Sequence, residues 1–125
     1  RRRRGALTAY GELAERADYA MRNTRVLARR ALTALQDGEP TAPEFADVVG
    51  ELAGAVGVLT AQLSREGDRS SARDAVLDVA RRARELDWEP GASGTVMLAQ
   101  VRSIAVDLLQ ATGLSRAEAL SLLRG

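Results

Sequence analysis

The stretch Thr95–Thr112 is the feature of this sequence that most constrains its fold. Drawn as a helix at about 100° per residue, it is apolar over more than half of its circumference. The apolar arc consists of Met97, Leu98, Val101, Ile104, Ala105, Leu108 and Leu109, extended by Ala99 and Val106. The narrow polar strip opposite consists of Gln100, Ser103, Asp107 and Gln110. Such a helix needs apolar neighbours on several sides, so we expect it to be the most buried helix of a small helical bundle.

Arg102 is the exception within this arc, because the helical wheel places it between Leu109 and Val106. We expect a mostly buried stem and a guanidinium paired with a carboxylate of another helix, since an unpaired charge there would be costly. The candidate partners are Asp18, Asp47 and Asp78. The alternative is an arginine at the edge of the core that extends its guanidinium into solvent.

Composition favours helix in the rest of the chain. The 125 residues include only three prolines and 3% aromatic residues, so the core has to be built from Leu, Val and Ala. Apolar repeats separated by short connections predict an all-α fold, an antiparallel bundle of four main helices plus a short C-terminal helix. The length predicts a single domain over residues 1–125.

The first predicted helix runs from Ala6 to about Gln36 and ends at Gly38 and Pro40. Its apolar positions follow alternating steps of three and four, as in a coiled coil: Tyr10, Leu13, Ala17, Ala20, Thr24, Leu27, Ala31 and Leu35. The helix would be about 46 Å long, against about 27 Å for the central helix. We therefore expect its N-terminal part to overhang the bundle or to fray.

Glycines interrupt the second predicted helix, which opens with the capping-box sequence Thr41–Glu44. Each of Gly50, Gly54 and Gly57 costs about 1 kcal/mol relative to alanine in a helix, so each needs a reason. We expect close approach of a neighbouring helix. The alternative is a flexible segment that responds to a ligand.

Three features in the second half of the chain mark the ends of predicted elements or of the core. We expect Trp88, in the connection after the third helix, to cap one end of the core; the alternative is a ring that stacks on a ligand. Gly113 ends the central helix. A second capping box, Ser115–Glu118, starts the last helix.

Residue types exclude several kinds of chemistry. The chain has no cysteine and no histidine, so it cannot form disulfides, Cys/His zinc sites or a histidine-based catalytic site. It has no glycine-rich phosphate loop and none of the common hydrolase or metalloprotease motifs. We therefore predict no enzyme activity, no catalytic residue, no metal site and no cofactor.

Positive charge is concentrated in the first helix. All 18 basic residues are arginine; residues 1–36 contain nine of them against three acids, and residues 37–125 contain nine against fourteen. One interpretation is a solvated face with intrahelical pairs such as Glu12–Arg16. The other is a weak, salt-sensitive anion-contact face formed by Arg22, Arg25, Arg29 and Arg30. Binding to nucleic acid is not expected, since few aromatic side chains could stack on bases.

Two segments, AQVRSIAVDLLQATG at 99–113 and NTRVLARRAL at 23–32, resemble the C-terminal soluble part of bacterial fusaric-acid-resistance-type (FUSC) membrane proteins. The segments lie near opposite ends, so the resemblance covers most of the chain. In that family a half with several transmembrane helices precedes a cytoplasmic helical half, and members are regarded as exporters of aromatic acids and related compounds. The resemblance implies a cytoplasmic accessory domain, serving assembly or regulation, at the inner (plasma) membrane.

The start of the chain agrees with this resemblance. Because it begins with arginine, we expect a segment of a longer protein, whose transmembrane half is missing here. Within the chain we predict no membrane span and no signal peptide. The cluster Arg1–Arg4 suits the cytoplasmic end of a membrane helix or a contact with anionic lipid, and would also suit a purification tag.

Leu7 and Tyr10 continue the apolar seam onto the overhang, so we expect a helix–helix contact there. The partner would be a second copy of the chain or the missing membrane half. The competing hypothesis for the whole chain is a free-standing helical module that uses its N-terminal arginines to bind nucleic acid or an acidic partner.

Overall fold

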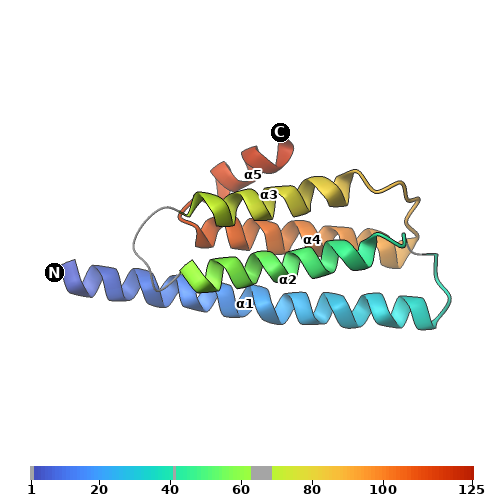
Figure 1. Cartoon of the computed structure of the whole chain (residues 1–125), viewed down its shortest axis with the longest axis horizontal. Coiled ribbons are helices and arrows are strands. Elements are labelled where there is room, and N and C mark those ends of the chain that lie inside the picture. The colour runs from blue at the N-terminus through green and yellow to red at the C-terminus, as the bar shows by residue number, and fades with distance from the viewer. Residues whose placement is uncertain (1, 41, 63–68) are drawn as a thin grey trace.

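The computed structural model describes residues 2–40, 42–62 and 69–125, with side chains described from residue 11 onward. These residues form five helices (Figure 1): α1 Arg2–Gln36, α2 Phe45–Gln62, α3 Ser70–Arg84, α4 Ala92–Ala111 and α5 Arg116–Arg124. The described ranges contain no strand. The predicted all-α fold is therefore confirmed.

The first four helices run alternately in opposite directions (Figure 1), and their packing contacts join them in a ring. Each packs against the next along the chain, and α1 closes the ring by packing along α4. The short α5 lies outside the ring, against α3 and α4. Helix α4 therefore contacts all four other helices, as its wide apolar arc predicts.

The core follows from this central position of α4. Its buried side chains include Met97, Val101, Ile104, Ala105, Val106, Leu108 and Leu109. They meet aliphatic side chains from the inner faces of α2 and α3, among them Leu52, Leu59 and Val76, which are fully buried. The helix begins at Ala92, about one turn before the predicted start at Thr95.

Helix α1 contributes a narrow seam of small side chains. Ala17, Ala20 and Leu27 are buried as predicted, and the buried Thr24 hydroxyl donates to the Ala20 carbonyl oxygen at 2.7 Å. At the end of the seam the prediction of Leu35 is wrong, since Leu35 is 56% exposed and Ala34 is buried instead. The alternating steps of three and four residues lead to position 34. The smaller Ala34 is therefore buried, although the larger side chain of Leu35 had suggested burial at position 35.

The N-terminal part of α1 projects well beyond the ends of the other helices, so the predicted overhang is helical (Figure 1). Leu7 and Tyr10 lie on this part, and their side chains fall outside the described residues. The same holds for the side chains of Arg1–Arg4. The contacts expected for these residues stay predictions.

The α2 glycines do not have the predicted role. Gly50, Gly54 and Gly57 all lie on the exposed face of α2, and a Cβ atom added at any of them would have nothing within 4 Å. Close approach of a neighbouring helix within the bundle is therefore wrong, because the α2 positions that face neighbours carry larger side chains. Backbone geometry does explain Gly38 and Gly113, which end α1 and α4 with φ values of 71° and 106°.

Helices α2 and α4 are each long and apolar enough to cross a membrane, by length and composition alone. The expectation of no span rested on uncharged runs in the sequence, which is a stricter test. In the bundle both helices contribute buried residues to the core, and core helices often have this composition.

Candidate functional site

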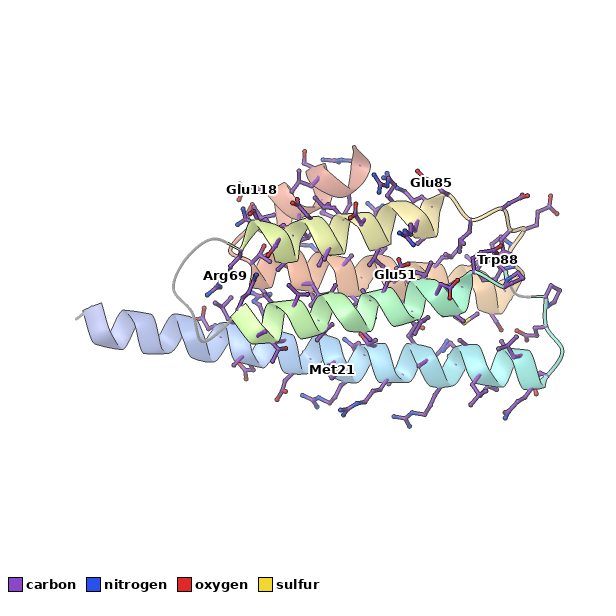
Figure 2. All side chains as sticks on the ribbon, viewed as in Figure 1. Met21, Glu51, Arg69, Glu85, Trp88 and Glu118 are labelled. Carbon is purple, nitrogen blue, oxygen red and sulfur yellow. The ribbon has the colours of Figure 1, made fainter. Side chains whose placement is uncertain are left out.

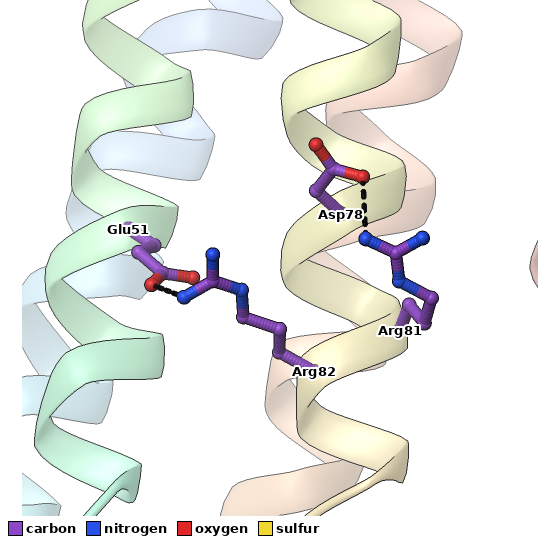
Figure 3. Close-up of polar contacts among 4 residues, drawn as sticks. All are labelled: Glu51, Asp78, Arg81 and Arg82. Carbon is purple, nitrogen blue, oxygen red and sulfur yellow. Dashed lines mark hydrogen bonds and ion pairs between the residues drawn. The ribbon is translucent and has the colours of Figure 1, made fainter.

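Arg102 does not form the predicted buried ion pair. Its side chain is exposed, and none of the hydrogen bonds and ion pairs between described residues involves it. The proposed partner Asp78 pairs instead with Arg81 at 3.0 Å, one turn along α3 (Figure 3). The wheel places Arg102 in the apolar arc correctly. That arc, however, is wider than the surface that α3 and α5 cover, so Arg102 lies at the open edge of the core.

An open apolar groove of about 240 Å³ lies at this edge, between α3, α4 and α5. We call it the Arg102 groove, and its lining residues are Ala80, Ala83, Arg84, Leu86, Trp88, Leu98, Val101, Arg102 and Leu123. Two of them are arginines and none is acidic. The groove therefore combines apolar walls with positive charge.

Trp88 is fixed at the end of the bundle where α2 and α4 begin (Figure 2). Its indole Nε1 donates to the Pro40 carbonyl oxygen at 3.3 Å, and its ring lies 5.4 Å from that of Phe45 at an interplanar angle of 53°. The indole also packs on Gly94, where an added Cβ would lie 2.6 Å from Trp88 Cζ2. Trp88 packs against the core as predicted and also lines the Arg102 groove, so the ligand-stacking alternative stays open.

The four arginines of the predicted anion-contact face are all exposed along α1. Arg22, Arg25 and Arg29 follow the spacing of one outward strip, whereas Arg30 is rotated by about 100° from Arg29. None of the four forms an ion pair with another described residue. The only ring contact of this strip is the Arg22 guanidinium, 5.6 Å from the centre of the Tyr19 ring.

A shallow hollow between α1 and α4 contains charges of both signs. It is lined by Glu12, Glu15, Arg16, Tyr19, Arg22 and Asp107. Burial raises the pKa of Asp107, and the positive charges of Arg16 and Arg116 oppose that rise. In the described part of the chain, acidic side chains form no cluster that could hold a metal ion.

Sequence reasoning missed how the arginines of α3 connect the helices. Arg73 donates to Thr112 Oγ1 and to the Thr112 carbonyl oxygen, both at 2.9 Å. Arg82 pairs with Glu51 of α2 (Figure 3), and Arg84 donates to the Leu123 carbonyl oxygen of α5 at 2.9 Å. The helix dipole alone would explain Arg82 and Arg84 near the C-terminal end of α3, and nothing in the local sequence marks Arg73, so these contacts could not be predicted.

Comparisons with known proteins give one relative. The chain is 36% identical over 114 residues to an uncharacterised protein of Corynebacterium glutamicum. The match covers 85% of this chain but 29% of the relative, so the chain spans less than a third of that protein's length. No protein family model and no solved structure matches the chain.

Proposed function

We propose that this bundle is a cytoplasmic accessory domain of a FUSC-like membrane exporter of aromatic acids or related compounds. Its role would be assembly or regulation, with no chemistry of its own. The resemblance supports this, because its two segments belong to α4 and α1, which pack along each other. The two resembling segments thus come from the pair of helices, α1 and α4, that pack along each other in the bundle.

The observation that carries the proposal is the projection of α1 (Figure 1). The other helices end well short of its N-terminus, so a membrane segment joined there would not collide with them. With about 1.5 Å per residue, the projecting turns would act as a stalk between bundle and bilayer. Arg1–Arg4 would lie next to the anionic lipid headgroups of the cytoplasmic face.

The proposed partners are the transmembrane half of the same protein or a second copy of the chain. Either would contact the stalk through Leu7 and Tyr10, the apolar positions that continue the α1 seam. A homo-oligomer formed there would couple the subunits of an exporter.

Proteolysis of the full-length protein in sealed, right-side-out membrane vesicles tests this topology. We expect the bundle to be protected from added protease and to be cleaved once detergent opens the vesicles. Cleavage of the bundle from the outside of intact vesicles would overturn the proposal. Recovery of the full-length protein without any membrane attachment would do the same.

The competing function is a free-standing module that binds nucleic acid or an acidic partner through its N-terminal arginines. It is favoured by one observation, the exposed and unpaired strip of Arg22, Arg25 and Arg29 in the described structure. The exporter domain would be attached to a membrane, whereas the free-standing module would not and would bind its partner selectively. Tight, sequence-dependent binding to duplex DNA would promote the module over the exporter domain.

A further inference from the structure

We propose that the Arg102 groove binds a small monocarboxylate, that is, a compact apolar body bearing one carboxylate. The inference is argued only from side chains of α3, α4, α5 and the connection between α3 and α4, although its ligand belongs to the chemical class of the cargo in the proposed function. Three properties of the groove support it: its walls, its charge and its fixed aromatic side chain.

The walls of the groove favour an apolar ligand of limited size. Ala80, Ala83, Leu98, Val101 and Leu123 provide aliphatic surface. Their burial by a ligand would be favourable at about 25 cal/mol per Å². The volume of about 240 Å³ is below the roughly 300–1,000 Å³ usual for drug-sized ligands. A single ring or a short acyl chain therefore fits better than a larger molecule.

The charge of the groove favours an anion. No acidic residue lines it, and Arg84 already donates one N–H to the Leu123 carbonyl oxygen. Arg102 has no partner among the described residues, so its planar guanidinium is free to donate two parallel hydrogen bonds. A carboxylate matches this geometry, as a phosphate also does, and the single charge of a carboxylate suits one unpaired guanidinium. The ligand would supply the carboxylate that no other helix provides.

The aromatic side of the groove is already in place before a ligand arrives. Trp88 is held by its hydrogen bond to Pro40, by Phe45 and by the absence of a side chain at Gly94. A ligand that packs on the indole therefore does not have to order it, which lowers the entropic cost of binding.

Trp88 also provides the measurement, because it is the sole tryptophan of the chain. The ¹⁵N-labelled protein has one indole N–H signal, which can be followed by NMR during titrations. The probes are benzoate and hexanoate, with neutral benzamide and inorganic phosphate as controls for the charge and for the apolar body. We expect a saturable shift of the indole signal with a carboxylate and none with either control. Whichever carboxylate binds more tightly identifies the ligand body as aromatic or aliphatic.

Two variants test the role of Arg102. Because the side chain is exposed, Arg102→Gln should leave the fold and thermal midpoint intact while weakening carboxylate binding about tenfold or more. Arg102→Glu should abolish binding. The matched control is Arg116→Gln, which removes the same charge from the first turn of α5, outside the groove lining. Unchanged affinity in Arg102→Gln, equal affinity for benzamide, or no saturable shift with either carboxylate would each overturn the proposal.

Discussion

At the residue scale, Gly94 lies beneath the indole ring of Trp88, and this contact leaves no room for a methyl group. An added Cβ would approach both Trp88 Cζ2 and Pro90 Cβ to 2.6 Å, well inside van der Waals distance. Because these neighbours belong to the rigid rings of Trp88 and Pro90, the strain cannot be relieved by turning a flexible side chain. Gly91, three residues earlier, has nothing within 4 Å of the equivalent position.

Gly94→Ala should therefore destabilise the bundle by about 1–3 kcal/mol, the usual cost of overpacking. Thermal unfolding followed by circular dichroism measures the loss, and the fluorescence of Trp88 should change with it. Gly91→Ala is the matched control; because Gly91 is the N-cap residue of α4, this change should lower the midpoint, but by less than Gly94→Ala does. Equal midpoints for the two variants would contradict the packing of Trp88 on Gly94.

Asp107 gives a second residue-scale prediction, through pH. Burial raises the pKa of Asp107 above its ordinary value of 3.8, despite Arg16 and Arg116. A folded-state pKa above the unfolded value means that the ionised carboxylate opposes folding at neutral pH, and that this cost disappears as the pH falls below both values. Asp107→Asn should therefore raise stability slightly at pH 7, by less than about 1 kcal/mol for a partly solvated group.

The measurement is urea unfolding of Asp107→Asn and the parent protein at pH 7 and near pH 3. The advantage of the variant should be present at pH 7 and absent at the lower pH. A less stable variant at pH 7 would mean that attraction to Arg16 and Arg116 outweighs the burial of the carboxylate.

At the element scale, the outward strip of α1 should bind anions through charge alone. Arg22, Arg25 and Arg29 present three unpaired guanidiniums on successive turns. Their contacts would be with phosphate groups. Such binding weakens steeply as the salt concentration rises, because the release of counterions from the phosphates then contributes less free energy. The strip offers only Tyr19 as an aromatic neighbour, so it provides no platform for stacking bases.

The corresponding test is titration with duplex DNA and with anionic vesicles at two salt concentrations. Binding should be weak, independent of base sequence and lost at the higher salt. Substitution of Arg22, Arg25 and Arg29 together by glutamine should reduce the slope of log affinity against log salt by the share of about three phosphate contacts. Arg81→Gln is the matched control, since Arg81 is exposed on α3 and already paired with Asp78. Persistent binding by the triple variant would exclude this face as the contact.

Helix α5 illustrates what local sequence predicts well. Its capping box is present as expected: Ser115 Oγ accepts from the Glu118 amide at 3.1 Å, and the Glu118 carboxylate accepts from the Ser115 amide at 2.9 Å. These hydrogen bonds lower the pKa of Glu118. Such a motif is readable because all of its partners lie within four residues of one another.

At the scale of the whole molecule, periodicity predicted the helices, their antiparallel order and the central place of α4. It could not predict which parts of an apolar arc would be covered. Arg102 was expected to be covered because a wheel gives the direction of a side chain from its own helix but not how far the neighbouring helices extend. The α2 glycines were misread for a different reason, since the wheel itself puts Gly50, Gly54 and Gly57 opposite the buried residues of α2. The Arg102 groove depends on where α5 ends relative to α3 and α4, and on Gly94 accommodating Trp88. Both relations depend on how separate segments pack together, so neither can be predicted from the sequence of one helix.

The projection of α1 also has a mechanical consequence. Helix α1 packs along α4 and α2 but touches neither α3 nor α5 among the described residues. A force applied at the projecting end would therefore act on the bundle as shear along two interfaces, α1 with α4 and α1 with α2. The helices that form the Arg102 groove would receive this load by two routes: directly through α4, which is a wall of the groove, and through α2, which packs against α3.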